Sequence, residues 1–414
     1  MNMSKHFPET GTPWDALKAQ MEDMTAKDID WRHGRNGYNV FFAGPDVLQV
    51  VKEAYGMFIS ENGLNQGAFP SLKVMEDEVV QMALDLFQAP DGAAGGMTSG
   101  GTESIIMAVK SCRERAREQG VDVSKANIVI PYSGHPAFNK AGLYLGLEII
   151  RTPIDDETRL PDLAAFEAAI NDNTIMCVGS APAFPSGVVE QIPELSEIAR
   201  KHDKWFHVDA CVGGYFAPFA ELNGVELPPY NFTNPGVSSM SADLHKFGYA
   251  AKGASTVLYR SEELQKYQAT DFNVWPSGRM VTPTLAGTRP GGAIAAAWAV
   301  MNYLGKEGYT AKAKSVLETR ARLEKGLADL GFVVHGPSKL MIINFSKPGL
   351  ELYSLWGAMN KRGWWPGATT EPPALHMMLT PAHEAALDDF LKDLAAATEE
   401  AEKGQAEAKE VRYS

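Results

Sequence analysis

The sequence predicts an α/β protein with a large domain built on a mostly parallel sheet and a smaller C-terminal α+β domain. Three observations predict this class. The chain has 414 residues, 45% of them hydrophobic, which is enough for a large core and more than one domain. Between about residues 97 and 259, short apolar runs alternate with amphipathic helical stretches, as in parallel sheets. The last hundred residues instead mix charged helices with short strands.

Six apolar runs are predicted to form the strands of the large domain. They are Asn127–Ile130, Leu147–Ile150, Ile175–Gly179, Phe206–Asp209, Ser239–Ala242 and Thr256–Tyr259. Helices are predicted between strands at Pro161–Ile170, with Asp162 in the opening turn, and at Ile192–Lys204, entered through Pro193. Because ligands of such sheets bind at the carboxyl ends of the strands, we expect the functional residues there.

The remaining elements belong to the end of the chain. Ala293–Met301 is predicted to be a buried helix, since it is far shorter than the roughly 20 residues that span a bilayer. A charged helix from Tyr309 to Leu330 is predicted to end at Gly331, a C-cap. After it we expect strands at Phe332–His335, Met341–Phe345 and His376–Leu379, and helices at Leu352–Lys361 and from Glu384. The predicted parts of the chain are residues 1–60, 61–305 and 306–414.

Composition excludes several classes of function. A net charge of -13 argues against a nucleic-acid partner held through its phosphates. The cysteines Cys112, Cys177 and Cys211 have no metal-ligand spacing, so we expect buried hydrophobic side chains and no metal site. The N-terminus has no apolar signal core, and no membrane anchor is expected, which favours a cytoplasmic location.

The most informative feature is a lysine, Lys246, that follows His245 just beyond a predicted strand. A neighbouring apolar run ends in the carboxylate Asp209. Together they suggest pyridoxal phosphate chemistry, in which the lysine forms a Schiff base with the cofactor aldehyde and the aspartate keeps the pyridine nitrogen protonated. A buried aspartate needs a partner, which the pyridinium would supply. Taken alone, a His-Lys pair after a strand is also typical of a surface turn.

A glycine-rich turn, Ser99–Ser104, leads into a helical run and adds to this interpretation. Free backbone donors and the helix dipole make such a junction a phosphate site, here around Gly101 and Thr102. An ordinary capped helix start has a similar sequence. The order along the chain of phosphate turn, carboxylate and lysine favours the cofactor site.

Other candidates lie in loops after strands. His135 could stack on a flat cofactor ring or be a hydrogen-bonded surface residue, and His245 could donate to the phosphate or cap the turn. Ser180 could place a hydroxyl near the phenolic oxygen, unless its loop is only a rigid proline turn. The Thr288–Gly292 loop offers another anion-binding helix start, in which Arg289 could alternatively form a structural ion pair.

From about Phe7 to Ser414 the sequence resembles pyridoxal-phosphate enzymes of fold type I, specifically the group II decarboxylase superfamily and, within it, the sphingosine-1-phosphate lyase family. The motifs that carry the resemblance are Ser99–Ser104, Gly179–Pro182, His207–Gly214, Ser241–Gly253 and Gly287–Gly292. The Cys-x-Gly-Gly ending and the Phe-Gly-Tyr-Ala-x-Lys-Gly continuation are similar to the lyases rather than to the decarboxylases.

The resemblance implies roles for individual residues. Lys246 would carry the cofactor, Asp209 would pair with the pyridine nitrogen and His135 would stack on the ring. Gly101, Thr102 and His245 would hold the phosphate. The family is dimeric with shared active sites, so residues 1–60 would make dimer and active-site contacts. Thr288 and Gly291 would serve the cofactor of the neighbouring subunit.

The substrate side departs from the family pattern. Phe41 and Phe42 stand where the lyases have a Tyr-His pair, and Asn65 stands in a stretch that matches their Asn-Pro-Leu-His run only in part. Phenylalanine cannot donate a hydrogen bond to a substrate phosphate, although Tyr38 could compensate. The natural substrate could therefore differ from a phosphorylated sphingoid base. The expected substrate-binding residues are Tyr38, Phe41, Asn65, Lys252 and Arg289.

The predicted function is retro-aldol cleavage of a phosphorylated β-hydroxy amine into an aldehyde and phosphoethanolamine. Lys246, Lys252 and His135 are the candidates for the general base. A pyridoxal-phosphate-dependent amino-acid decarboxylase is the first alternative, and a non-catalytic cofactor-binding scaffold is the second.

Overall fold

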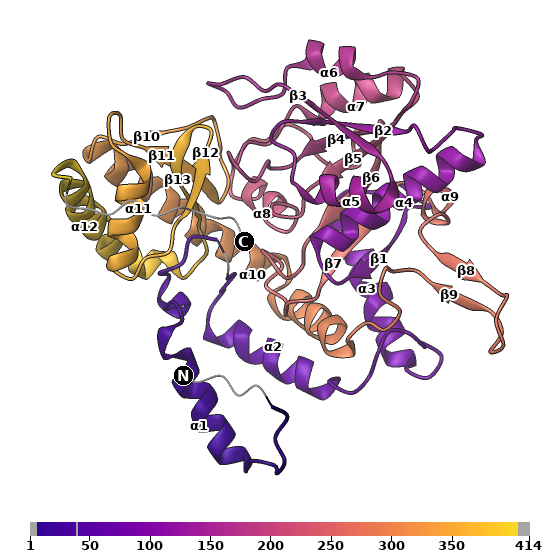
Figure 1. Cartoon of the computed structure of the whole chain (residues 1–414), viewed down its shortest axis with the longest axis horizontal. Helices are drawn as coiled ribbons and strands as arrows, with labels where there is room; N and C mark the ends of the chain where they lie inside the picture. Colours follow the sequence, from indigo (N-terminus) through magenta and orange to yellow (C-terminus); the bar gives the residue numbers. More distant parts are fainter. Residues whose placement is uncertain (1–5, 39, 405–414) are drawn as a thin grey trace.

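The computed structural model describes residues 6–38 and 40–404. A seven-stranded sheet forms the centre of the large domain, with the strand order β1-β7-β6-β5-β4-β2-β3 (Figure 1). The strands are β1 (Ala94–Thr98), β2 (Asn127–Pro131), β3 (Glu148–Thr152), β4 (Thr174–Ser180), β5 (Trp205–Asp209), β6 (Val237–Ala242) and β7 (Ser255–Tyr259). Strands β6, β5, β4, β2 and β3 run parallel, while β7 is antiparallel to β6 and β1. The predicted α/β class is confirmed.

Strand β1 is the element of this sheet that the sequence did not predict. It contains Gly95 and Gly96, which are unfavourable inside strands. The structure gives the reason for the first glycine, because a Cβ at Gly95 would lie 2.5 Å from a side-chain carbon of Leu258 on β7. Close packing against the neighbouring strand therefore replaces the usual apolar pattern.

Helices pack beside the sheet of the large domain. They are α4 (Gly101–Glu118), α5 (Ala137–Leu145), α6 (Leu163–Ala169), α7 (Ile192–Lys201), α8 (Ala217–Glu221) and α9 (Glu262–Gln265). Asp162 caps α6 by accepting hydrogen bonds from the amides of Ala164 and Ala165 at 2.9 and 3.0 Å. Helix α7 ends three residues earlier than predicted, because Asp203 adopts a left-handed conformation with φ 53°.

Helix α10 (Gly291–Asp329) connects the two domains. Its first half is the predicted buried apolar helix, and its second half is the predicted charged helix. Gly305 interrupts the helix with φ 53° and ψ -174°, a conformation that favours glycine. The predicted boundary between residues 305 and 306 lies at this break, although the division into domains stays a prediction.

The small domain has a four-stranded antiparallel sheet with the order β10-β11-β13-β12. Its elements are β10 (Val333–Val334), β11 (Ile342–Ser346), α11 (Leu352–Lys361), β12 (Gly367–Thr370), β13 (Pro373–Met378) and α12 (His383–Glu402). Strand β12 was not predicted, because its sequence of Gly-Ala-Thr-Thr has little apolar character. Pairing with β13 holds it in place.

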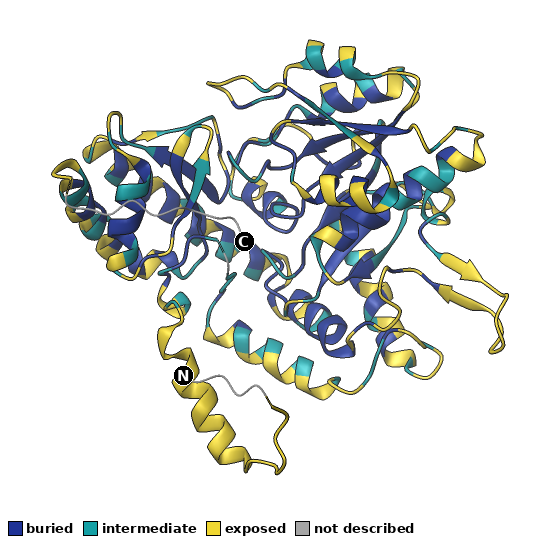
Figure 2. Cartoon of the chain, in the orientation of Figure 1, coloured by how far each residue is buried: buried dark blue, intermediate teal, exposed yellow. Residues whose placement is uncertain are grey.

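The N-terminal segment forms α1 (Trp14–Met24), α2 (Pro45–Met57) and α3 (Pro70–Leu86), with short 3-10 turns at Thr25–Lys27 and Trp31–His33. Helices α2 and α3 pack on α10. Every residue of α1 is exposed, and this helix projects from the molecule (Figures 1 and 2). The hairpin of β8 (Thr270–Phe272) and β9 (Met280–Thr282) projects in the same way.

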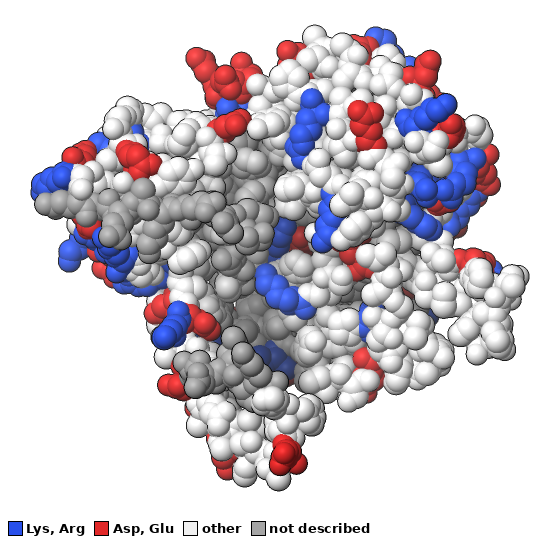
Figure 3. Space-filling view, in the orientation of Figure 1, with Lys and Arg blue, Asp and Glu red and all other residues white. Residues whose placement is uncertain are grey.

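The surface shows no segregation of charge on the face in Figure 3, where Lys and Arg are interspersed with Asp and Glu. Among the residues that the structure describes, no helix is long and apolar enough to cross a membrane.

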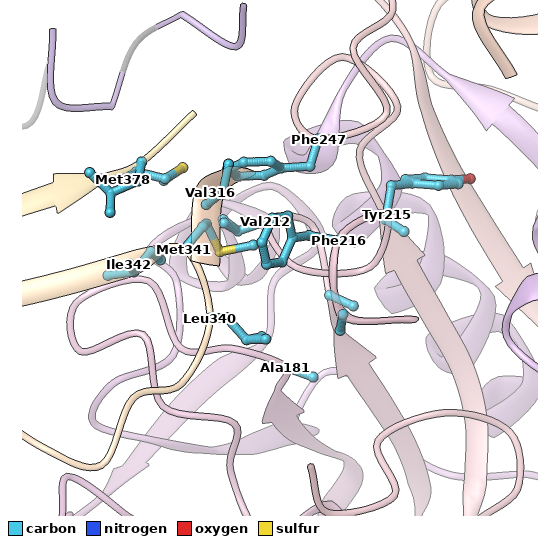
Figure 4. Packing of buried hydrophobic residues seen from close by; sticks show 14 of the residues in the cluster. Ala181, Val212, Tyr215, Phe216, Phe247, Val316, Leu340, Met341, Ile342 and Met378 are labelled. Atoms are coloured by element: carbon cyan, nitrogen blue, oxygen red, sulfur yellow. The ribbon is translucent and has the colours of Figure 1, made fainter. Parts of the chain in front are cut away.

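An apolar cluster joins the two domains behind the loop that follows β6. Figure 4 shows Val212, Phe216 and Phe247 of the large domain with Val316 of α10 and Met341 of the small domain. The Phe247 ring is buried and meets Phe216 edge to face, with centroids 5.1 Å apart. Because Phe247 directly follows Lys246, this packing fixes the backbone that carries the lysine.

We expect the Phe247→Ala variant to lose about 3–5 kcal/mol of unfolding free energy, because the truncation leaves a cavity between the domains. Urea unfolding followed by circular dichroism would measure the loss. The matched control is Phe7→Ala, whose side chain is 95% exposed and should change stability by less than about 0.5 kcal/mol. Equal effects of the two substitutions would contradict the anchoring role of Phe247.

Candidate active site

The parallel register of three strands brings the predicted site residues together. Ser180 at the end of β4 pairs with Asp209 at the end of β5, and Asp209 pairs with Ser241 of β6. The carboxyl-terminal ends of β4, β5 and β6 therefore lie side by side at one edge of the sheet. A cavity of about 350 Å³ opens there. The predicted residues that line it are Gly101, Thr102, His135, Ser180, Asp209, His245 and Lys246.

Lys246 stands in the turn after β6. Its Nζ lies 3.0 Å from Oδ2 of Asp243, and its side chain is 22% exposed toward the cavity. Burial alone would lower the pKa of Lys246, but the charge and hydrogen bond of Asp243 outweigh it, so the pKa is raised. The free amine is therefore held as an ammonium ion at neutral pH.

Asp209 is 7% exposed and is held in place by its own backbone neighbourhood. Its Oδ1 accepts a hydrogen bond from the amide of Cys211 at 3.1 Å. The amide of Ala210 donates to the carbonyl of Ser241 on β6, which fixes the start of the turn after β5. A buried carboxylate in this position requires a cationic or hydrogen-bonding partner in the cavity.

The glycine turn and the start of α4 form another wall. A Cβ at Gly101 would lie 2.7 Å from Oδ2 of Asp243 and 2.8 Å from Sγ of Cys211, so only glycine fits without displacement. Glu103 ties the turn down, because its carboxylate accepts hydrogen bonds from the amides of Ser99 at 2.7 Å and Leu285 at 2.8 Å. The first-turn amides of α4 face the cavity side, which suits an anion.

Two histidines of the cavity are held in the neutral form. Nδ1 of His135 accepts a hydrogen bond from the amide of Ala137 at 3.1 Å, which leaves the proton of the neutral ring on Nε2. Burial lowers the pKa of His135, against the opposing charge of Asp209. Nδ1 of His245 accepts from the amide of Ala254 at 3.3 Å, and burial lowers the pKa of His245 to about 4.

These groups fit pyridoxal 5'-phosphate. The cavity offers an amine for the aldehyde in Lys246, a carboxylate for a protonated ring nitrogen in Asp209 and an imidazole for the ring face in His135. The glycine turn lets backbone amides approach a phosphate closely, because a side chain at Gly101 would fill that space. The roles of the individual residues stay predictions.

Four of the predicted site residues do not line this cavity in the chain, namely Thr288, Gly291, Asn65 and Tyr38. Thr288 and Asn65 are exposed. Gly291 starts α10 in close contact with the carbonyl of Glu61, to which its amide donates at 2.9 Å. Tyr38 lies against Gly367 of β12. Their predicted roles toward substrate, or toward the cofactor of a neighbouring subunit, stay predictions.

Phe41 lies on the other side of the lysine turn. Its ring meets Phe247 edge to face at 5.1 Å, and Nζ of Lys252 stands 4.8 Å from the ring centroid. Lys252 also donates to the carbonyl of His245 at 3.3 Å. Lys252 is exposed as a residue, but burial of its amine and the nearby Lys246 charge lower its pKa to about 8. Phe41 thus contacts a lysine next to the site but cannot hydrogen bond to a substrate.

Arg289 has a structural position, which was the alternative to substrate binding. Its guanidinium is buried and pairs with the carboxylate of Glu76. It also donates to the carbonyls of Met97 at 3.3 Å and Gly63 at 3.1 Å. The structure thus places Arg289 in the ion pair that was its alternative role, and its contact with substrate stays a prediction.

Two carboxylates of the site were missed at the sequence level. Asp243 was inside a quoted motif but received no role. Glu190 has no local signal, yet it is fully buried and accepts hydrogen bonds from Oγ of Ser133 at 2.6 Å and the amide of Ser180 at 2.7 Å. It therefore connects the loop that carries His135 with the strand that carries Ser180.

A second cavity of about 440 Å³ adjoins the first, and His135 and Phe184 line both. It lies between the domains, with Tyr132 of the large domain and Tyr353 and Ala368 of the small domain among its walls. The two cavities together offer room for a ligand that extends beyond the cofactor.

Comparison with known proteins gives a consistent set of relatives. The pyridoxal-dependent decarboxylase conserved domain matches residues 1–346. The sphingosine-1-phosphate lyase of Oryza sativa subsp. japonica is 38% identical over 383 residues, covering 90% of this chain and 70% of the relative. Sphingosine-1-phosphate lyase 1 of Rattus norvegicus is 36% identical over 394 residues, covering 94% and 69%.

Solved structures agree with these relatives. The sphingosine-1-phosphate lyase of Burkholderia pseudomallei has a TM-score of 0.92 at 35% identity, covering 97% of this chain and 94% of that one. A glutamate decarboxylase of Lactobacillus brevis has a TM-score of 0.86 at 19% identity, covering 99% and 97%, and shows the shared fold alone.

The buried position of Glu190 gives a pH-dependent prediction. Burial raises the pKa of Glu190 from 4.5 to about 7, so its contribution to stability is present below pH 4.5 and is lost as the pH rises to 7. Glutamine imitates the protonated acid, accepting from Ser180 and donating to Ser133. As the pH rises from about 4 to about 8, the unfolding free energy of the Glu190→Gln variant should therefore increase by roughly 2–3 kcal/mol relative to that of wild type.

Urea unfolding of both proteins across this pH range would test the prediction. Glu318→Gln on the exposed face of α10 serves as control, and its difference from wild type should not vary with pH in this way. A Glu190→Gln difference that stays constant with pH would show that folding does not raise the pKa of Glu190.

Proposed function

This chain belongs to the sphingosine-1-phosphate lyase family of pyridoxal-dependent enzymes, and we propose that it cleaves the carbon–carbon bond of a phosphorylated β-hydroxy amine such as sphingosine 1-phosphate. It is a pyridoxal-phosphate-dependent aldehyde-lyase, whose products would be an aldehyde and phosphoethanolamine. The observation that carries the proposal is one cavity that holds Lys246, Asp209 and His135, in a chain 38% identical to a curated lyase.

The chemistry divides between cofactor and protein. When bound, pyridoxal phosphate stores the electron pair that is released as the bond between Cα and Cβ breaks. Lys246 supplies the amine that holds the cofactor and yields to the substrate amine. Asp209 keeps the ring nitrogen protonated, and the first-turn amides of α4 and His245 hold the phosphate. His135, which lines the same cavity, would stack on the ring and limit its movement.

Cleavage requires a base for the β-hydroxyl proton, and the site favours Lys246. Its amine lies in the cavity, and its raised pKa makes it a strong proton acceptor once it is released. Lys252 donates to the His245 carbonyl outside the cavity lining. Nδ1 of His135 accepts from the amide of Ala137, so the neutral ring carries its proton on Nε2, and that nitrogen is a donor rather than an acceptor.

The second cavity supports a substrate with a hydrocarbon chain. Aromatic and aliphatic side chains line much of it, including Tyr132, Ile154, Phe184 and Tyr353. It continues from the cofactor cavity past His135 and Phe184. The chain of the substrate would lie there, while the amine reaches the cofactor.

The two alternatives receive less support. The decarboxylase structures are 15–19% identical to this chain, which supports the fold and nothing finer. The non-catalytic scaffold was suggested by the Phe41 and Phe42 substitutions. The lysine, the carboxylate and the phosphate turn are nevertheless all present in one cavity.

A homodimer with shared active sites belongs to the same proposal. The β8–β9 hairpin exposes Val274 and Trp275, and α1 exposes Trp14 and Met21. Exposed apolar side chains on projecting elements are typical of surfaces that another chain covers. The hairpin leads directly into the Thr288–Gly292 loop, so a partner that covers it would reach that loop. A cytoplasmic location and a role in sphingolipid metabolism also stay proposals.

The function is tested by incubating the cofactor-loaded protein with sphingosine 1-phosphate, other β-hydroxy amines and common amino acids, and identifying products by mass spectrometry. We expect an aldehyde and phosphoethanolamine from sphingosine 1-phosphate. Lys246→Ala should lose the visible absorbance of lysine-bound cofactor and at least about 1,000-fold of activity, because no other amine replaces the nucleophile.

Lys314→Ala, an exposed lysine of α10, is the matched control and should retain both properties. Carbon dioxide and an amine from an amino acid would establish the decarboxylase instead. Retention of the absorbance in Lys246→Ala would overturn the assignment of the lysine.

The dimer is tested by light scattering. Wild-type protein should have twice the mass of one chain, and replacing Val274 and Trp275 together by lysine should shift it toward one chain, because charges at the hairpin tip oppose burial. Leu222→Lys, at an exposed site on the large domain, is the control. A wild-type mass of one chain would refute the dimer.

A further inference from the structure

Asp243 is a buried carboxylate that the proposed function gives no contact with substrate or cofactor. It follows β6 and precedes Lys246 by three residues, and its side chain is 1% exposed. Its Oδ2 lies 3.0 Å from Nζ of Lys246 and 3.7 Å from Nε2 of His245. His245 is neutral, since burial lowers its pKa to about 4. Lys246 is therefore the cationic partner of this carboxylate.

The rest of the Asp243 carboxylate is enclosed. Within the described part of the chain, Oδ1 has no hydrogen-bond partner. Gly101 approaches so closely that a Cβ there would lie 2.7 Å from Oδ2 and 3.0 Å from Oδ1. An ionised carboxylate in such surroundings is costly unless a charge compensates it. The pair with Lys246 is thus what allows Asp243 to be buried and ionised.

Other titratable groups face the lysine, with opposing effects. A Cys211 thiolate would attract the ammonium, but burial raises the pKa of Cys211 well above its usual value and keeps the thiol neutral. Asp209 also attracts the ammonium, but its carboxylate accepts a hydrogen bond from the Cys211 amide and is not within ion-pair distance. Lys252 and the histidines His135 and His245 surround the site, and the Lys252 charge opposes a second cation. The short contact with Asp243 dominates this balance, because electrostatic attraction falls with distance.

We propose that Asp243 is the counter-ion that keeps the free Lys246 amine protonated, and that it thereby sets the pH dependence with which this lysine captures the cofactor aldehyde. The inference rests on the cofactor of the proposed function but is independent of the substrate. Capture requires the neutral amine: the ammonium releases a proton, the nitrogen adds to the aldehyde carbon, and the aldehyde oxygen leaves as water. Removing the carboxylate charge therefore makes the lysine reactive at lower pH.

The test compares cofactor-free wild-type protein with Asp243→Asn. Each is mixed with pyridoxal 5'-phosphate between about pH 6 and pH 10, and the visible absorbance of lysine-bound cofactor is followed by stopped flow. An opposite charge within about 4 Å shifts a pKa by about 1–3 units, so Asp243→Asn should capture the cofactor about tenfold faster at pH 7. This advantage should persist while both amines are mostly protonated and shrink once the pH reaches the lysine pKa of the variant. Titrations of the cofactor itself are common to both proteins and cancel in the ratio.

Two controls separate this role from others. Asp243→Glu keeps the charge and should follow the wild-type profile. Pyridoxal, which lacks the phosphate, should show the same acceleration with Asp243→Asn. A ratio near one at every pH, or an acceleration that disappears with pyridoxal, would overturn the proposal, because the latter would place the effect of Asp243 on the phosphate.

If Asp243→Asn does not fold, the ion pair can be tested from its other side. Burial alone would raise the pKa of Asp243, but the Lys246 charge outweighs burial, and the net pKa is lowered. The pair therefore stabilises the protein above about pH 4, and this stabilisation is lost as the pH falls through the lowered pKa. Lys246→Ala leaves the carboxylate unpaired. Its stability deficit should be largest at pH 7 and shrink toward pH 4, and a deficit independent of pH would overturn the pairing.

These outcomes are distinct from those of the functional test. Wild-type protein that captures the cofactor but cleaves no sphingosine 1-phosphate would refute the lyase and leave the role of Asp243 intact. If wild-type protein cleaves sphingosine 1-phosphate normally but Asp243→Asn captures the cofactor with an unchanged pH profile, the lyase stands and the role of Asp243 is refuted.

Discussion

The parallel register of β4, β5 and β6 is the constraint on which the site depends. It aligns Ser180, Asp209 and Ser241 at one edge of the sheet, so that each following turn begins at the same height. Lys246 reaches the cavity from the turn after β6, and His135 reaches it from the loop after β2. Residues far apart in the chain thus meet because strands end together, which is the usual reason that ligands bind at this edge.

Apolar packing then holds the turn that carries Lys246 in place. Phe247 is buried between Phe41 and Phe216, and the same apolar cluster includes side chains of α10 and the small domain. The lysine turn is therefore attached to the interface between the domains, where the second cavity also lies. Substrate that enters between the domains would meet a lysine whose backbone cannot easily shift.

Most buried charges of the site are balanced locally. Asp243 pairs with Lys246, Glu103 accepts hydrogen bonds from the amides of Ser99 and Leu285, and Arg289 pairs with Glu76. Glu190 has hydrogen bonds but no cation, and its pKa is accordingly raised to about 7 by burial. The cofactor would enter this balance as a further charged group, taking Lys246 from Asp243 and giving Asp209 a partner.

The sequence by itself determined the α/β class, the strands β2, β4, β5 and β6 that precede the site and several of the residues that line the cavity, because alternating apolar runs and short turns are local properties of the chain. Tertiary structure alone decided the rest. Strand β1 and the ion pair of Arg289 depend on partners more than 150 residues away. Glu190 gives no local signal, since its importance lies in joining two loops. Asp243 was visible within a motif, but only the 3.0 Å contact with Lys246 and the enclosure by Gly101 give it a role, because the energy of a buried charge depends on what surrounds it in space.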